Sequence, residues 1–242
     1  MFWWIVATLA AFFIKGLCGF ANTLVFSAIL SFGSSNINIT PVEVLLGFPT
    51  NLILAWKERK SIRWKLCIPL IVLILAGNIP GIFLLKNADA KSVKIFFGLV
   101  IVGIGVEMLL RERRPQKGKE SRLVLLMVGI LSGILSGMYG IGAMLAAYVS
   151  RVTKDSHSFK ANMCAVFLAE NIFRIPMYMA TGILTPVAIK QAALLFFVML
   201  AGLFAGIKSS SLLDEKAVKT LVILMLILSG AALVSGELFA GG

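Results

Sequence analysis

Apolar runs close to 20 residues long recur along the whole of this 242-residue chain and constrain its fold more than any other feature. A helix needs about 20 apolar residues to cross the hydrocarbon core of a bilayer. Only 14% of the residues are charged and 59% are hydrophobic, so no run is polar enough to build a separate soluble domain. The sequence therefore predicts an all-α polytopic membrane protein. We expect its apolar segments at 3–31, 41–57, 65–86, 92–110, 122–150, 159–181, 185–208 and 216–236.

The net charge of +12 comes from Lys and Arg residues that cluster in short connections between the apolar runs. Such clusters are typical of cytoplasmic loops and of contacts with anionic membrane lipids. Nucleic acid is not an expected partner, because the chain has no folded basic face to present. The N-terminus has no basic region and no clear cleavage site, so we expect no cleaved signal peptide. The predicted location is the inner (plasma) membrane, with several crossings.

The two halves of the chain share four short motifs in the same order and at a nearly constant offset. We interpret residues 1–110 and 123–242 as two four-segment repeats joined by a polar cytoplasmic connector, 111–122. The matched stretches are 15–23 with 136–144, 49–52 with 169–172, 77–81 with 202–206, and 90–94 with 215–219.

Loop charges predict how the repeats are oriented, since positive loops stay in the cytoplasm. The positive loops are 57–65, 111–122 and 151–160, and the uncharged ones, expected outside, are 32–40 and 180–189. Segment 122–150 then begins and ends on the cytoplasmic side, which predicts a re-entrant hairpin. Each half becomes one broken hairpin helix plus three transmembrane helices, and an odd number of crossings inverts the second repeat. Eight straight crossings with parallel repeats are the alternative.

Two glycine-rich stretches interrupt the first apolar run of each half: K-G-L-C-G-F-A-N from Lys15 to Asn22, and S-G-M-Y-G-I-G-A from Ser136 to Ala143. Glycine permits a backbone break, which lipid tolerates only where protein or a water-filled cavity satisfies the freed groups. The helix N-termini that follow would direct free amides at the centre and bind an anion. Close helix packing through small residues is the alternative. The substrate-contact candidates here are Gly16, Cys18, Gly19, Asn22, Gly137, Tyr139 and Gly140, and Lys15 is a candidate for coupling or gating.

Ionisable and amide side chains lie well inside the run 159–181. Such residues are costly in lipid and usually face a cavity or a partner. Glu170 and Arg174 are four positions apart on one helical face, so they can form a pair. We expect Arg174 to be the counter-charge of an anion and Glu170 to be a proton carrier or gate; a structural ion pair is the alternative. Asn171 and its repeat equivalent Asn51 are candidate hydrogen-bond donors to the substrate.

Other polar residues carry less information. Glu43 and Glu107 lie near the ends of apolar runs and are expected at the membrane interface. The three cysteines are an odd number without metal-ligand spacing, so no disulfide framework, metal site or cofactor is expected. No H-E-x-x-H motif and no His inside an apolar run is present, so we do not expect an enzyme.

With these residues, the chain resembles the sulfite exporter family, the TauE/SafE-type permeases of sulfur-containing anions. The resemblance covers nearly the whole chain. The resemblance rests on three stretches: G-L-C-G-F-A-N-T (Gly16 to Thr23), G-I-L-S-G-M-Y-G-I-G-A (Gly133 to Ala143) and the Pro- and Gly-containing pattern at 69–81. The resemblance implies transport of small anions such as sulfite, thiosulfate or organosulfonates across the inner membrane.

The leading hypothesis is therefore a secondary transporter that works by alternating access. No G-x-x-x-x-G-K-[ST] motif is present, so coupling is expected to come from protons or ions rather than from a P-loop. An anion channel is the alternative, and an intramembrane enzyme is less well supported. The expected partners are a small anionic substrate and membrane lipids; the oligomeric state stays open, and a homo-oligomer is compatible with the sequence.

Overall fold

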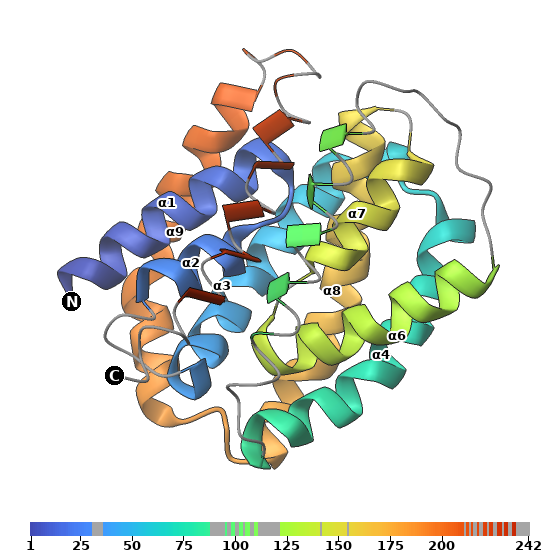
Figure 1. Ribbon diagram of the computed structural model, residues 1–242. Coiled ribbons are helices and arrows are strands. Elements are labelled where there is room, and N and C mark those ends of the chain that lie inside the picture. Colours follow the sequence, from blue (N-terminus) through green and yellow to red (C-terminus); the bar gives the residue numbers. More distant parts are fainter. Residues whose placement is uncertain are drawn as a thin grey trace.

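Figure 1 shows the computed structural model, which describes residues 1–30, 36–87, 122–140, 142–153 and 155–210, with single positions between 95 and 110 and between 212 and 235. These residues form helices and short connections, and no strand occurs among them. The helices are α1 (Phe2–Cys18), α2 (Asn22–Leu30), α3 (Asn36–Lys57), the 3-10 helix η1 (Arg59–Ser61), α4 (Trp64–Asn87), α6 (Arg122–Tyr139), α7 (Ala143–Val152), α8 (Ser156–Ala180) and α9 (Pro186–Ser210). The connector 111–122, except its last residue, and much of the expected segments 92–110 and 216–236 lie outside this description.

Four of the described helices contain stretches long and apolar enough to cross a membrane: Asn38–Lys57, Trp64–Leu84, Ser156–Ala180 and Pro186–Ser210. Large apolar side chains cover their outward faces; Val72 and Phe197, for example, are 61% and 77% exposed. Lipid is a favourable surrounding for such a surface, whereas water is not. The protein is therefore an all-helical, multi-pass membrane protein, as the sequence predicted.

The first apolar run of each half is divided into two helices. Run 3–31 contains α1 and α2, and run 122–150 contains α6 and α7. The chain turns back at the first break, because the rings of Trp4 on α1 and Phe26 on α2 have centroids only 5.7 Å apart. Helices α6 and α7 likewise pack on each other. The prediction that both runs are broken is confirmed.

A left-handed glycine follows the first helix of each pair. Gly19 has a φ of 83°, and its N–H donates to the Lys15 carbonyl at 2.7 Å. Gly140 has a φ of 71°, and its N–H donates to the Ser136 carbonyl at 2.7 Å. Such a conformation ends a helix and strains any residue that carries a Cβ. The two breaks therefore use the same local geometry at repeat-equivalent positions.

Gly16 and Gly137, in contrast, lie inside α1 and α6 and pack against other helices. A Cβ on Gly206 of α9 would lie 3.0 Å from the Gly16 Cα, and one on Gly81 of α4 would lie 3.1 Å from the Gly137 Cα. This close approach of backbones is the small-residue packing typical of membrane helices. Each glycine motif thus divides its roles: the first glycine packs and the second turns the chain.

The helix pairs α1/α9 and α4/α6 each join the first helix of one half to the third apolar segment of the other half, and Figure 1 shows both pairs side by side. In both pairs the two helices run in parallel. The approaching positions are Leu9 with Gly202 and Phe13 with Gly206 in the first pair, and Leu73 with Gly129, Ile74 with Gly133 and Asn78 with Gly137 in the second. The two halves therefore exchange equivalent contacts.

Two of the positive loops, 57–65 and 151–160, meet at one end of the molecule. The backbone N–H of Arg63 donates to the Asn162 side-chain oxygen at 2.8 Å, and the Arg63 guanidinium donates to the Val152 carbonyl at 2.8 Å. Helix α4 begins at this end and helix α7 ends there. Helices α3 and α8 pack against each other between the two parallel pairs and bring the polar residues of both halves to the centre.

Candidate functional site

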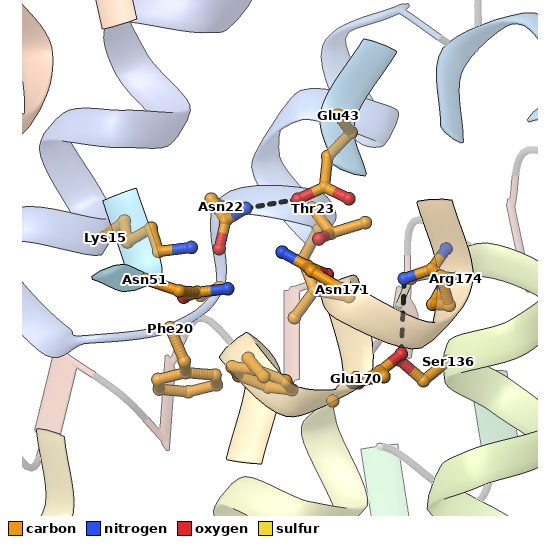
Figure 2. Close-up of a pocket in the computed structure, with 15 residues that line it drawn as sticks. Lys15, Phe20, Asn22, Thr23, Glu43, Asn51, Ser136, Glu170, Asn171 and Arg174 are labelled. Carbon is orange, nitrogen blue, oxygen red and sulfur yellow. Dashed lines mark hydrogen bonds and ion pairs between the residues drawn. The ribbon is translucent and has the colours of Figure 1, made fainter. Parts of the chain in front are cut away.

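A small cavity lies where the two helix breaks approach α3 and α8 (Figure 2). Its wall combines residues of α1, α2, α3, α6 and α8 with residues of both breaks. The centre of a water-sized sphere can occupy about 20 Å³ of it, which is enough for about one water molecule. A larger guest therefore requires the wall to move apart.

Most of the residues predicted from the sequence meet at this cavity. Those that line it are Lys15, Asn22, Asn51, Gly140, Glu170, Asn171 and Arg174. They come from both halves of the chain and, apart from Gly140, carry polar or charged side chains. The structure thus brings the first break, the second break and the two central helices to one point, although they are far apart in the sequence.

The other predicted residues lie around the cavity rather than on its wall. Gly16 and Gly137 form the helix contacts described above. Gly19 turns the chain against the aliphatic part of Lys160, and Cys18 is fully buried in an apolar cluster. The side chain of Tyr139 lies outside the described residues, as does Glu107.

Glu43, which was expected at the membrane interface near the end of an apolar run, is buried inside the protein. It is 4% exposed and lines the cavity. Helix α3 extends beyond the N-terminal end of the expected segment, so Glu43 lies two turns inside it, on the face that also carries Gly47 and Asn51. The spacing of three to four residues between these polar or small positions is the signal that could have identified Glu43. Ser136, on the opposite wall, was also missed.

The charges contributed by α8 are held in a network. The Arg174 guanidinium lies 3.3 Å from the Glu170 carboxylate, which confirms the predicted pair. Ser136 of α6 donates to the same Glu170 oxygen at 2.5 Å. Arg174 also donates to the Tyr178 hydroxyl at 2.6 Å, and that hydroxyl donates to the Gly137 carbonyl at 3.0 Å. This network ties α8 to α6 next to the second break.

The charges contributed by α1 and α3 are held more loosely. Lys15 is 1% exposed, and its ammonium lies 5.9 Å from the centre of the Phe12 ring. Among the described residues it makes no hydrogen bond and no ion pair. The Glu43 carboxylate accepts a hydrogen bond from the Asn22 amide. Figure 2 shows the Lys15 ammonium and the Asn171 amide pointing into the cavity from opposite sides.

Gly140 is the point at which the second break meets the residues of the first half. A Cβ added there would lie 2.9 Å from the Thr23 methyl group, 3.1 Å from a Glu43 oxygen and 3.5 Å from an Arg174 nitrogen. A glycine therefore serves two purposes at this position: it allows the left-handed turn, and it leaves room for three side chains.

Both helix N-termini that follow the breaks contribute to the wall, through Asn22 and Thr23 of α2 and through Gly142 immediately before α7. Helix N-termini carry partial positive charge and free N–H groups, which favours anions. Two side chains of the cavity wall also carry a buried polar atom without a hydrogen-bond partner among the described residues: the Asn51 oxygen, which is an acceptor, and the Arg174 Nε–H, which is a donor. The unpaired Arg174 donor and the Lys15 ammonium are thus positive groups that the described part of the protein leaves available.

The polar groups of this wall suit the binding of a small ligand. Among the described residues, no group of three His, Cys, Asp or Glu side chains could hold a metal ion. The three cysteines are buried as free thiols, and none of them lines the cavity. Amide, ammonium and guanidinium donors around a small buried space are the groups that bind a compact anion.

The family model described as Sulfite exporter TauE/SafE matches residues 4–233, nearly the whole chain. Comparison with curated proteins and with solved structures gave no match.

Proposed function

The chain belongs to the sulfite exporter TauE/SafE family, a family of membrane transporters, and from this premise we propose that it is a permease for a small sulfur-containing anion. Candidate substrates are sulfite, thiosulfate and organosulfonates, carried across the inner membrane. The observation that carries the proposal is the buried Lys15 ammonium, which lines the cavity and has no hydrogen-bond or ion-pair partner among the described residues. A buried charge is costly unless it is paired. A small anion in the cavity would be its partner.

The anion would bind between Lys15 and the amides of Asn22, Asn51 and Asn171. Arg174 would add positive charge, although Glu170 already neutralises part of it. In this arrangement Lys15 is the principal counter-charge and Arg174 a supporting one. Gly19 and Gly140 would position these groups by turning the chain, without contacting the anion themselves.

We also propose that residues 1–110 and 123–242 are inverted repeats separated by the connector 111–122. Two observations support this. Helices α4 and α6 run in parallel, and α7 ends beside the start of α4, so the hairpin α6–α7 begins and ends at the same end of the molecule. Helix α9 begins at the end of the molecule opposite to the one at which α8 begins. Helix α1 runs parallel to α9, so α1 also begins at that opposite end. The first hairpin would then enter from the other side of the membrane.

Alternating access would follow from this arrangement. The cavity has room for about one water molecule, so an anion of four or more atoms enters only when one half moves against the other. A proton or an ion would provide the coupling, and the carboxylates in the cavity wall are the groups that can bind either.

Transport by the full chain in proteoliposomes tests the proposal. We expect saturable uptake of radiolabelled sulfite and thiosulfate, and faster tracer entry when unlabelled anion is present inside. Lys15→Met should abolish both, whereas Lys190→Met, which changes an exposed lysine of α9, should leave them unchanged. Uptake without acceleration by internal anion would identify a channel instead. Failure to transport sulfite, thiosulfate and an organosulfonate would contradict the proposed substrate class.

A further inference from the structure

The two carboxylates of the cavity differ in what neutralises them. Glu170 is in contact with the Arg174 guanidinium and accepts a hydrogen bond from Ser136. Glu43 accepts a hydrogen bond from the neutral Asn22 amide, and no cationic nitrogen of any described residue lies within the 4.0 Å that defines an ion pair. Both side chains are buried, with exposed fractions of 1% for Glu170 and 4% for Glu43.

Charged groups face Glu43 from two other helices at longer range. These are Lys15 on α1, and Arg174 and Glu170 on α8. Lys15 and Arg174 attract the Glu43 carboxylate, and Glu170 repels it. Arg174 attracts Glu43 more strongly than Lys15 does, although Arg174 also contacts Glu170; Lys15 has no ion-pair partner among the described residues, so its charge is available to Glu43 or to a bound anion.

Neutral donors face Glu43 from the remaining elements around it. The Asn22 amide and the Thr23 hydroxyl come from α2, and the Asn171 amide comes from α8. A Cβ added to Gly47 would lie 3.2 Å from a Glu43 oxygen and 3.4 Å from the Asn171 nitrogen, so the carboxylate and this amide share one small space. These amides are the same donors that the proposed anion site uses.

A carboxylate and a substrate anion cannot both be charged beside the same donors without strong repulsion, because like charges interact strongly in a site with little water. A carboxylate that already has a cation in contact, such as Glu170, has its charge balanced by that cation. A carboxylate without such a partner can instead be neutralised by a proton when the anion arrives.

We propose that Glu43 is the proton-binding residue of the transport cycle and that its carboxylate occupies the donors of the anion site when no substrate is bound. This inference rests on the proposed function and adds the identity of the coupling group. A proton from the solvent side to which the cavity is open binds a Glu43 oxygen. The neutral carboxyl group then no longer competes for the hydrogen bond of the Asn22 amide or for the positive charge of Lys15. The anion binds to both groups instead.

Proton and anion then bind together and cross together. Thermodynamic linkage is reciprocal: if protonation of Glu43 strengthens anion binding, anion binding strengthens proton binding by the same factor. The inference therefore predicts cotransport of anion and proton in the same direction, and it assigns Glu170 to the Arg174 network rather than to the proton.

Thiosulfate binding to the purified full chain tests the inference, because thiosulfate itself does not titrate near neutral pH. We expect the wild-type protein to bind radiolabelled thiosulfate about 10-fold more tightly at about pH 5 than at about pH 8. In weakly buffered solution, adding thiosulfate at a pH near the midpoint of this change should cause net uptake of up to about half a proton per anion bound. Glu43→Gln should bind thiosulfate equally at both pH values and take up no proton. The matched control Glu58→Gln, which changes a carboxylate that contacts His157 outside the cavity wall, should keep both properties.

Glu43→Asp provides a second readout. It keeps a carboxylate but withdraws it from Asn22, so proton uptake should persist with a shifted pH midpoint. The inference is overturned if Glu43→Gln keeps the wild-type pH dependence, if Glu43→Asp loses proton uptake while it still binds thiosulfate, or if Glu58→Gln abolishes the pH dependence. Wild-type binding without proton uptake would overturn only this inference. Absence of wild-type thiosulfate binding at either pH would contradict the proposed function for this substrate as well.

Discussion

Each half of the chain contributes one buried cation and one buried carboxylate to the cavity, and the two halves hold them differently. In the second half, Glu170 and Arg174 contact each other, and Ser136 and Tyr178 fix them in place. In the first half, Lys15 and Glu43 lie on different helices and form no ion pair within the described part of the chain. The helix breaks and the helix crossings around them are nevertheless equivalent.

The difference follows from two aligned positions at which the halves carry different residues. The matched stretches align Lys15 with Ser136 and Thr50 with Glu170. In the second half Ser136 donates to Glu170, whereas in the first half Thr50 donates to the Gly47 carbonyl of its own helix at 2.7 Å. Lys15 therefore has no carboxylate at the position where Ser136 has one. The helix contacts are thus similar in the two halves, whereas the cation without an ion-pair partner among the described residues comes from the first half.

The largest expected effect is on stability, and it distinguishes the ion-paired Arg174 from Lys15, which forms no ion pair among the described residues. Arg174→Ala should lower the free energy of unfolding by about 3–5 kcal/mol, because it leaves the Glu170 carboxylate buried and unpaired. Lys15→Met keeps the side-chain volume and removes an unpaired charge, so it should leave stability unchanged or raise it. Denaturant unfolding in detergent micelles measures both. Equal losses for the two variants would break the comparison.

A smaller effect tests whether the scaffold is shared. Gly81→Ala and Gly206→Ala each introduce a Cβ into the parallel helix contacts, at 2.5 Å from the Ile134 carbonyl oxygen for Gly81 and in overlap with the Phe13 carbonyl for Gly206. Each should cost about 1–3 kcal/mol of unfolding free energy. The same unfolding experiment should return similar values for both. A loss of stability at only one of the two positions would show that the two helix contacts do not contribute equally to the free energy of unfolding.

A third effect compares the two breaks themselves. Gly19→Ala and Gly140→Ala both place a Cβ in the left-handed region, at a cost of about 1 kcal/mol each. At Gly19 the nearest atom is the flexible Lys160 Cγ, whereas at Gly140 the new Cβ presses on Thr23 and Glu43. We therefore expect only Gly140→Ala to weaken thiosulfate binding. Equal binding by the two variants would contradict the role given to Gly140.

The smallest expected effect concerns a helix cap that lies away from the cavity and from both helix breaks, and it serves as a reference. Asp155 caps the N-terminus of α8, and its carboxylate accepts from the Ser158 backbone N–H at 2.7 Å. This bond, supported by the Ser158 hydroxyl, holds the pKa of Asp155 below its ordinary value of 3.8. Because the folded-state pKa is lowered, the stabilisation is present above pH 3.8 and is lost as the pH falls through the folded value.

Asp155→Ala should therefore cost about 1 kcal/mol at neutral pH, measured as a shift in the unfolding midpoint. The difference from the wild type should disappear at pH values below the folded pKa. Thiosulfate binding should not change at neutral pH, and a change there would show that the reference is not independent of the cavity.

Much of the fold and part of the site were predictable, because the signals are local. Hydropathy over about 20 residues marks a membrane helix, and a glycine at a left-handed position marks a break. The pair Glu170–Arg174 follows from a spacing of four on one helix. Such properties depend on neighbours within one or two turns, and the amino-acid sequence specifies those neighbours directly.

The rest depended on contacts between distant segments. The sequence by itself determined that the chain is a helical membrane protein whose first and fifth apolar runs are broken and which carries an ion pair on α8. Only the tertiary structure decided that Gly16 packs while Gly19 turns, that Glu43 lies beside Asn22, and that Lys15 has no ion-pair partner among the described residues. The physical reason is that burial and pairing are set by which helices approach each other, and no local pattern encodes the meeting of α1, α2, α3 and α8.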